Sequence, residues 1–205
     1  MFEEMKIYWI GGSPCCGKST ISEMLVEEFG FEMYKCDDYL ERYTIIGFEN
    51  DIKIMKKVKS MSLDETWLRD VDEQVEDEVE FYKEALKIVA SDLEKRYKGK
   101  KVLVEGTAIL PEFIKENGID INNYVCIVPT KEFQIDKYSK RNWVNYYLQE
   151  CSDLKKAFEN WMERDARYAE IMKTKAYSYG MNVLVVDGNK SIEENYLTVK
   201  RLFEL

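Results

Sequence analysis

The chain has 205 residues, of which 45% are hydrophobic and 34% charged, and its formal net charge is −9. This composition is typical of a globular protein and excludes a disordered chain. The acidic balance argues against broad, non-specific nucleic-acid binding, which depends on neutralising many phosphates, so nucleic acid is not an expected partner.

The chain length and the residue types that are absent further limit the class of protein and the kinds of site that can be expected. Residues 1–205 suit a single domain. No apolar run reaches the roughly 18–20 residues that span a bilayer, and the acidic start Met1–Lys6 is unlike a signal peptide, so we expect a cytoplasmic protein with no membrane partner. The sequence has no histidine, which excludes Ser-His-Asp catalysis and His–metal sites. Its five cysteines form no C-x-x-C pair, which excludes a zinc ribbon.

Short apolar runs alternate with helical patterns along the chain. The runs predict five strands, at Lys6–Ile10, Phe31–Lys35, Val102–Glu105, Tyr124–Val128 and Val183–Asp187. The helical patterns cover Ser19–Phe29, Tyr39–Arg42, Ser62–Tyr97, Pro111–Asn117, Thr130–Glu150, Asp153–Tyr179 and Ile192–Phe203. This alternation predicts an α/β fold with a mostly parallel sheet that is covered by helices on both faces.

The longest predicted helix, Ser62–Tyr97, begins with a capping box at Ser62–Glu65. Its apolar residues recur every three or four positions, which predicts contact with the core by Leu63, Trp67, Val71, Val75, Val79, Tyr82, Leu86, Val89 and Leu93. Much of the acid in the chain lies between Asp64 and Glu84, and we interpret it as a solvated helix face.

A complete Walker A pattern, G-x-x-x-x-G-K-[ST], joins the first predicted strand to the first predicted helix. Its fixed positions are Gly12, Gly17, Lys18 and Ser19. The glycines let backbone N–H groups converge on phosphate oxygens, Lys18 can reach the β- and γ-phosphates, and the Ser19 hydroxyl can ligate Mg²⁺. With a strand before it and a helix after it, the pattern predicts ATP binding rather than a plain glycine-rich turn. The expected phosphate-binding residues are Gly12, Ser13, Pro14, Cys15, Cys16, Gly17, Lys18, Ser19 and Thr20.

Acidic residues follow two of the predicted strands, at the sheet edge where ligands bind in α/β proteins. Asp37 and Asp38 follow the second strand, and either, with Asp37 favoured, could orient or deprotonate a substrate hydroxyl or contact magnesium through water. The alternative is that Asp38 only caps the next helix. Glu105 ends the third strand, where a Walker B acid would position magnesium, and Gly106 permits a close approach. A plain strand-end charge is the alternative for Glu105.

The segment Glu132–Tyr179 is rich in aromatic and charged residues. We interpret this region, about 132–179, as a helical lid, against the alternative of helices that simply pack on the sheet. Arg164 and Arg167 lie three residues apart on one predicted helix face and could grip a phosphate together. Salt bridges with neighbouring acids are the alternative, and Arg141 is a further candidate. Asp187–Lys190 could line the nucleotide base or form an ordinary turn.

Cys15 and Cys16 occupy variable positions of the Walker A pattern, where small residues are tolerated. A sharper hypothesis is that the positive end of the following helix lowers the pKa of one thiol and makes nucleotide binding sensitive to oxidation.

The chain resembles the P-loop kinases of the nucleoside-monophosphate-kinase type. It resembles more loosely the kinase-like ATP-binding proteins that include zeta toxins and chloramphenicol phosphotransferase. The likeness rests on Gly12–Thr20, Asp37–Asp38, Val102–Gly106 and the arginine-bearing segment before the fifth strand. It implies a three-layer P-loop NTPase fold, with a five-stranded parallel sheet in the order 2-3-1-4-5, helices on both faces and a helical lid. It also implies that the acid after the second strand, here Asp37, contacts the acceptor.

The chain departs from adenylate kinases in several respects. Its loop reads Gly-Ser-Pro-Cys-Cys-Gly-Lys-Ser rather than the Gly-x-Pro-Gly-x-Gly-Lys-Gly-Thr style, and it has no Cys/His set for a zinc-binding lid. No nucleoside-monophosphate site is recognisable either. Adenylate kinase activity is therefore not expected, and the acceptor stays open.

These observations predict a kinase that uses ATP and Mg²⁺ and phosphorylates a small hydroxyl-bearing acceptor. Ser19 would ligate the metal, with Asp37 or Glu105 acting through water. The expected catalytic residues are Lys18, Asp37, Glu105, Arg164 and Arg167. The alternatives are a P-loop ATPase or nucleotide-dependent switch acting on a protein partner, which the small size disfavours, and a non-catalytic nucleotide-binding module, which Lys18 and Ser19 disfavour. The choice between ATP and GTP and the oligomeric state stay open.

Overall fold

Five parallel strands form one sheet in the computed structural model of the protein, which describes residue 2 and residues 5–205. The strands are β1 (Lys6–Gly12), β2 (Glu32–Lys35), β3 (Lys101–Glu105), β4 (Tyr124–Pro129) and β5 (Asn182–Val186). Their order across the sheet is β2-β3-β1-β4-β5, and each neighbouring pair is parallel. The predicted fold class, including the sheet order, is confirmed.

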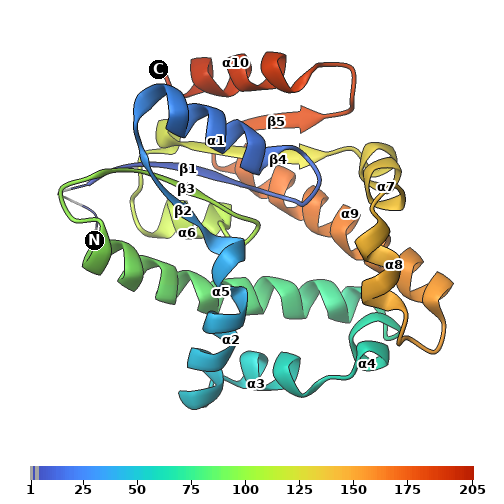
Figure 1. The fold of residues 1–205 in the computed structure, drawn as a ribbon. Helices are drawn as coiled ribbons and strands as arrows, with labels where there is room; N and C mark the ends of the chain where they lie inside the picture. Colours follow the sequence, from blue (N-terminus) through green and yellow to red (C-terminus); the bar gives the residue numbers. More distant parts are fainter. Residues whose placement is uncertain (1, 3–4) are drawn as a thin grey trace.

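Helices cover the sheet on both faces (Figure 1). One face carries α1 (Lys18–Phe29) and α10 (Ile192–Leu202), and the other carries α5 (Val71–Arg96), α6 (Pro111–Glu116) and α9 (Leu154–Ser178). Successive residues of a strand point to opposite faces, so Tyr8 and Ile10 of β1 enter the core beneath α1 and α10. Ile7 and Trp9 enter the core on the other side. Two hydrophobic cores therefore flank one continuous sheet.

The connection between β2 and α5 is more elaborate than predicted. A 3₁₀ turn at Cys36–Tyr39 leads into α2 (Leu40–Glu49), α3 (Lys53–Ser60) and α4 (Leu63–Trp67). The predicted helix Tyr39–Arg42 is thus the start of a longer helix, and α3 was not predicted. These helices lie beyond α5 from the sheet (Figure 1).

The prediction of one helix over Ser62–Tyr97 is wrong, because the chain breaks between α4 and α5. Ser62 does form the predicted capping box with Glu65 at the start of α4. Asp70 then caps α5 by accepting hydrogen bonds from two backbone N–H groups of its first turn. The Trp67 carbonyl, which the break leaves free, accepts a hydrogen bond of 2.8 Å from the Asn160 amide of α9. The apolar spacing runs through the break, so periodicity alone cannot reveal it.

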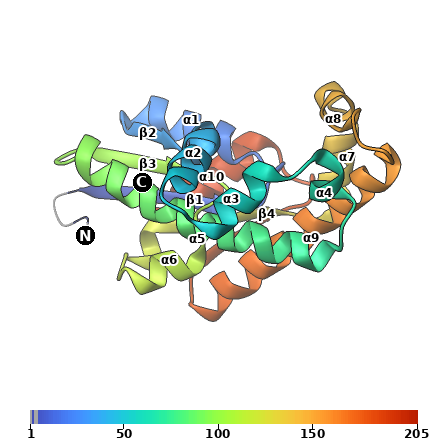
Figure 2. The same ribbon diagram turned by 90° about the horizontal axis from the view of Figure 1, so that it is seen from below.

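The predicted helix Thr130–Glu150 is also two helices, α7 (Lys131–Ser139) and α8 (Asn142–Leu148). These two helices and α4 pack against one end of α9 (Figure 2). Their buried side chains form a third hydrophobic cluster, made of Trp67, Tyr138, Val144, Leu148, Cys151, Ala157, Trp161 and Met162. Trp67 and Trp161 stack at its centre with ring centroids 4.6 Å apart. The region formed by α4, α7, α8 and the adjoining end of α9 therefore has a small hydrophobic core of its own.

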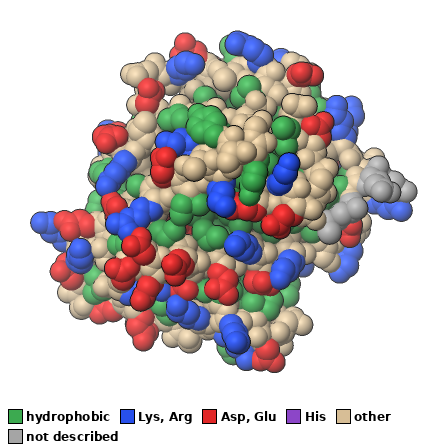
Figure 3. Space-filling view, turned by 180° about the vertical axis from the view of Figure 1, so that it is seen from behind, with side chains coloured by type: hydrophobic (Ala, Val, Ile, Leu, Met, Phe, Trp, Pro, Cys, Tyr) green, Lys and Arg blue, Asp and Glu red, His purple; other side chains and the backbone are tan. Residues whose placement is uncertain are grey.

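Helix lengths and surface charge can be compared with the predictions made from composition. Among the described residues, none of the helices combines the length and apolar character needed to cross a bilayer. The face opposite to that of Figure 1 carries acidic and basic side chains interspersed (Figure 3). The prediction about the N-terminal segment falls partly on residues 1, 3 and 4, which lie outside the described residues.

Asp92 of α5 is a buried acid that connects α2 to the sheet. It accepts hydrogen bonds of 2.9 Å from the Tyr34 hydroxyl and from Arg42 Nη2. Burial by itself raises the pKa of Asp92, but the bonds from Arg42 and Tyr34 outweigh burial and hold the pKa below its usual value. A carboxyl with a depressed folded-state pKa stabilises the fold above its unfolded pKa, and this contribution is lost as the pH falls through the folded value.

We expect Asp92→Asn to lower the free energy of unfolding by about 1–3 kcal/mol at pH 7, since it weakens bonds to a buried ionised group. The deficit should shrink as the pH falls from about 4 towards 2, because the parental carboxyl then becomes protonated as well. Urea unfolding across this pH range measures both effects. Glu94→Gln alters an exposed acid on the same helix and is the control. A deficit that stays constant with pH would contradict the expected linkage.

Candidate active site

The segment between β1 and α1 turns tightly against strand β4. Gly12 has a φ of +123°, and a Cβ there would lie 1.8 Å from the Ile127 carbonyl oxygen, so only glycine fits. The Ser13 N–H donates to the same carbonyl at 3.2 Å. Gly17, with a φ of +83°, directly precedes α1. The loop therefore presents the positive end of α1 at the carboxyl end of β1, an arrangement that favours anions.

Lys18 lies beneath this loop with only 5% of its surface exposed. Its ammonium donates a hydrogen bond of 2.8 Å to the Ser13 carbonyl. Burial alone lowers the pKa of Lys18, but the neighbouring Cys16 and Glu105 more than offset it and raise the pKa above its usual value. Lys18 therefore holds a full positive charge inside the loop at neutral pH.

Ser19 and Glu105 meet at the carboxyl ends of two adjacent strands. The Ser19 hydroxyl donates to Glu105 Oε1 at 3.2 Å. Glu105 is buried, which raises its pKa, while the nearby charge of Lys18 acts in the opposite direction. Mg²⁺ that is bound beside phosphates is held by only a few protein oxygens. A hydroxyl next to a carboxylate can supply oxygens of this kind.

Asp37 is anchored to the loop that follows Glu105. It accepts a hydrogen bond of 3.1 Å from the Thr107 N–H and lies 3.5 Å from the Thr107 hydroxyl. A Cβ on Gly106 would come within 2.5 Å of the Cys36 Cβ and 3.1 Å of Asp37 Oδ1. Gly106 thus permits a close approach, as the sequence predicted, here of the Cys36 and Asp37 side chains after β2. Asp38 is exposed and caps no helix by its side chain.

An open cavity of about 330 Å³ lies under α2, α3 and α4, and residues of α5, α8 and α9 also line it. A chain of contacts joins it to Asp37. Glu78 of the cavity accepts a hydrogen bond of 3.1 Å from the Tyr82 hydroxyl, and the Tyr82 ring lies 5.7 Å from that of Tyr168. The Tyr168 hydroxyl in turn donates to the Thr107 carbonyl at 2.7 Å. Burial raises the pKa of Glu78 to about 7 against the opposing charge of Arg164.

The two predicted phosphate-gripping arginines have different surroundings. Arg164 is partly buried and lines the cavity, 2.6 Å from Asp165 and 3.3 Å from Glu78, with its guanidinium 4.7 Å from the Trp67 ring centroid. Arg167 is half exposed and pairs with acids at positions 72 and 163, outside this cavity. The structure thus brings Arg164 to the cavity and leaves Arg167 on the outer side of α9.

Cys15 and Cys16 lie in the Walker A loop, and the charge of Arg141 acts on Cys15. Burial raises the pKa of Cys15 to about 11, although the charges of Arg141 and Lys18 oppose the rise. Burial also raises the pKa of Cys16, whose thiol donates to the Ser13 carbonyl at 3.0 Å. The hypothesis of a lowered thiol pKa is therefore wrong in direction, because desolvation outweighs the helix end. Arg141, in contrast, lies close enough to Cys15 to act on its charge.

The turn after β5 is ordered by its own side chains. Asp187 accepts a hydrogen bond of 2.9 Å from the Asn189 N–H, and Ser191 begins α10 with a capping box. Both are local contacts that stabilise a turn and a helix start. A role for Asp187–Lys190 at the nucleotide base stays a prediction.

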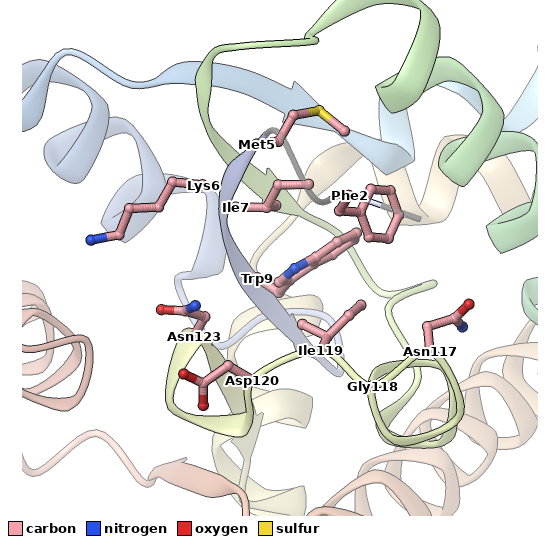
Figure 4. Close-up of a pocket in the computed structure, with 10 residues that line it drawn as sticks. All are labelled: Phe2, Met5, Lys6, Ile7, Trp9, Asn117, Gly118, Ile119, Asp120 and Asn123. Atoms are coloured by element: carbon pink, nitrogen blue, oxygen red, sulfur yellow. The ribbon is translucent and has the colours of Figure 1, made fainter.

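A second cavity, of about 430 Å³, lies at the other end of β1 from the Walker A loop (Figure 4). Trp9 forms its floor, and the Phe2 ring lies beside it with centroids 5.6 Å apart. The residues that line it include the start of β1 and the turn Asn117–Asp120. None of the residues predicted for the site belongs to this cavity.

Sequence reasoning missed the residues that shape the first cavity. Gln74, Glu78 and Tyr82 are spaced by four residues and share one face of α5. Gln74 is 3% exposed and lines the cavity, whereas Glu76 and Glu80 beside these residues are exposed. The acidic stretch is therefore only partly a solvated face. The sequence signal that could have revealed this face is the presence of polar residues, Gln74 and Glu78, on the apolar side of the helical pattern.

Together the sheet order and the loop after β1 define a P-loop NTPase fold, like that of shikimate kinases. No protein-family model matches the chain, and no curated protein matches it in sequence. The fold itself is shared with solved structures. Shikimate kinase from Acinetobacter baumannii, solved in complex with shikimate, has a TM-score of 0.52 and 16% identity, with 99% of this chain and 95% of that chain covered.

Two further structures have the same relation to the chain. Shikimate kinase from Bacteroides thetaiotaomicron has a TM-score of 0.54 and 12% identity, with 98% and 99% of the two chains covered. A Thermus thermophilus protein has a TM-score of 0.52 and 14% identity, with 98% and 97% covered. At such identities the likeness is one of fold alone. The looser resemblance to zeta toxins and chloramphenicol phosphotransferase stays a prediction.

Proposed function

We propose that the protein is a kinase that transfers the γ-phosphoryl group of ATP to a hydroxyl group of a small molecule. The observation that carries this proposal is the position of Asp37. It accepts a hydrogen bond of 3.1 Å from the Thr107 N–H, in the loop that follows Glu105. The Thr107 carbonyl accepts a hydrogen bond from Tyr168, whose ring contacts Tyr82 of the cavity wall. An acid between a phosphate loop and a separate cavity suits transfer between two bound substrates better than hydrolysis. The shikimate kinase-like fold supports the same class of reaction.

The donor half of the site would use the loop and its buried lysine. The backbone N–H groups of Gly12–Ser19 would bind the phosphate oxygens, and Lys18 would neutralise charge on the β- and γ-phosphates. Ser19, with Glu105 behind it, would hold Mg²⁺ directly or through water. When bound, the metal neutralises the charge that develops on the phosphates. These residues position the donor and do no covalent work.

The acceptor half would use Asp37. Its carboxylate would orient the acceptor hydroxyl and take up its proton as the new oxygen–phosphorus bond forms. The bond between the γ-phosphorus and the bridging oxygen breaks at the same time, and ADP leaves. The Thr107 N–H fixes the orientation of the carboxylate. Contact of Arg164 or Arg167 with the transferring group would require exchange of their carboxylate partners, and it stays a prediction.

The test is incubation of the protein with labelled ATP and a metabolite extract, followed by separation of labelled products. We expect a labelled small molecule, and Asp37→Asn should lower its formation by about 10²–10⁴-fold, the usual contribution of a positioned acid or base. The affinity for ATP should stay nearly unchanged, since Asp37 lies on the acceptor side.

Asp38→Asn is the matched control, because Asp38 is an adjacent acid that is exposed like Asp37, whereas Asp37 is the one held by the Thr107 N–H. It should transfer phosphate at close to the parental rate. If Asp37→Asn also keeps that rate, the assignment of Asp37 to the acceptor fails. The single-domain organisation, the lid over about 132–179 and the cytoplasmic location stay predictions.

A further inference from the structure

Helix α9 lies against one face of the sheet (Figure 1) and contacts both halves of the proposed site. The carbonyl of Asp165 accepts a hydrogen bond of 3.2 Å from the Ser13 hydroxyl of the Walker A loop. The Tyr168 hydroxyl donates a hydrogen bond of 2.7 Å to the carbonyl of Thr107, whose N–H holds Asp37. Asp165 and Tyr168 are three residues apart, within one turn of the helix. One rigid element therefore supports the phosphate loop and the loop of the acid.

The two contacts are shielded from solvent, since Ser13, Thr107, Asp165 and Tyr168 are all buried. The ring of Tyr168 packs edge-on against Tyr82 of α5, with centroids 5.7 Å apart. Burial raises the pKa of Tyr168, so its hydroxyl stays protonated and donates. In the described part of the chain, this hydroxyl makes its one hydrogen bond to Thr107. Buried polar groups are nearly always paired, so the bond holds α9 and this carbonyl together.

The orientation of Thr107 depends on such anchors, because a glycine precedes it. Glycine adopts a wider range of backbone angles than other residues, so the peptide group between Gly106 and Thr107 has little intrinsic preference for one orientation. The Gly106 N–H donates to the Ile10 carbonyl at 3.2 Å and fixes one side of this loop. Tyr168 fixes the other side. Asp37 is exposed, so the direction of its carboxylate depends on the Thr107 N–H.

We propose that Tyr168 is a positioning residue for phosphoryl transfer, which acts through Thr107 to hold Asp37 in the orientation that meets the acceptor hydroxyl. The proposal rests on the proposed kinase function and adds a residue outside the predicted site. Tyr168 is buried, so it acts through its neighbour and not by contact with a substrate. Because α9 also binds Ser13, the same bond fixes Asp37 relative to the Walker A loop. Small displacements of reacting groups slow a reaction strongly.

The first test needs no substrate, because amide hydrogen exchange by NMR reports on the Thr107 N–H of the full chain. Tyr168→Phe keeps the ring and removes only the hydroxyl. We expect the Thr107 amide to exchange at least about fivefold faster than in the parental protein, relative to the amides of α10, since the loop loses an anchor. Unchanged relative exchange at Thr107 in the folded variant would overturn the proposal.

Tyr124→Phe is the matched control for this variant. Tyr124 is also buried, and its hydroxyl donates a hydrogen bond of 3.2 Å to the carbonyl of Ile109, two residues beyond Thr107. The control therefore removes the same kind of bond from the same loop without touching the residue that holds Asp37. It should leave the relative exchange at Thr107 unchanged. Equal acceleration in both variants would mean that the loop merely loosens as a whole, which would overturn a specific role for Tyr168.

The second test measures transfer with labelled ATP, Mg²⁺ and a metabolite extract. Tyr168→Phe should lower the rate at saturating ATP about tenfold, with an unchanged KM for ATP, because a displaced acid slows the chemical step. Tyr124→Phe should keep close to the parental rate. Since Tyr168 acts through Asp37, its substitution should have little further effect in the Asp37→Asn background.

The outcomes separate this proposal from the function on which it rests. Equal fold losses from Tyr168→Phe with and without Asp37→Asn would assign Tyr168 a purely structural role and overturn the proposal. A parental rate in Tyr168→Phe would do the same and leave the kinase function standing. Absence of labelled product from the parental protein, with ATP still bound, would overturn the kinase function and the positioning role with it.

Discussion

Lys18→Ala should abolish measurable turnover, with a loss of about 10³–10⁵-fold, the range associated with a cation that stabilises phosphoryl transfer. The reason is the environment of the side chain. Lys18 is 5% exposed, and its pKa lies above the usual value, so the charge is held in place before any ligand binds. A preorganised charge in a site that excludes water has more effect on a developing negative charge than a solvated one. ATP binding, measured by calorimetry, should weaken as well.

The control for this variant is Lys115→Ala, which removes an exposed lysine from α6. It should leave both turnover and ATP affinity unchanged. Because Lys18 also donates to the Ser13 carbonyl, urea unfolding of Lys18→Ala must accompany the kinetics. A folded Lys18→Ala protein with parental turnover would remove the Walker A loop from the reaction and with it the proposed function.

Gly12→Ala should be among the most destabilising single-methyl changes in the chain. The new Cβ would lie 1.8 Å from the Ile127 carbonyl oxygen and 2.6 Å from its carbon, both of which belong to the central sheet. Backbone in a strand cannot move aside as a flexible side chain can. The backbone strain costs about 1–3 kcal/mol, and overpacking costs a similar amount. We therefore expect a loss of roughly 2–6 kcal/mol in the free energy of unfolding, measured with urea.

Gly30→Ala separates the two causes. Gly30 ends α1 with a φ of +66°, and a Cβ there would meet no atom within 4 Å. It therefore carries the strain of a left-handed residue without the clash, and it should lose only about 1 kcal/mol. Equal losses for Gly12→Ala and Gly30→Ala would mean that β4 yields to the new methyl group, contrary to the rigid packing inferred here.

Local sequence patterns were enough to predict the residues of the proposed donor half of the site. The Walker A residues have separate physical roles at fixed spacing, and the apolar runs on either side predict a strand and a helix. Asp37 and Glu105 were found because the ends of parallel strands meet at one edge, and the structure brings both beside the loop. Gly106 was predicted to permit a close approach, and the groups that approach it are the Cys36 and Asp37 side chains.

The surroundings of the cavity depend on contacts that no local pattern encodes. The apolar spacing continues through the break after Trp67, and the carbonyl freed there is bound by Asn160, which is 93 residues away. Arg164 and Arg167 share a helix face in sequence, but acids from α5 divide them between two surroundings. The Cys15 pKa rises because tertiary packing buries the thiol, against the effect of the helix end.

The resemblance supplied the expected sheet order, whereas the sequence by itself determined the α/β fold class and the Walker A pattern with its two strand-end acids. These features depend on periodicity and on backbone geometry, which act over a few residues. Only the tertiary structure decided which charges are neutralised and which side chains line the cavity. Those properties depend on side chains brought together from α4, α5 and α9, and the free energy of a buried charge is set by such neighbours.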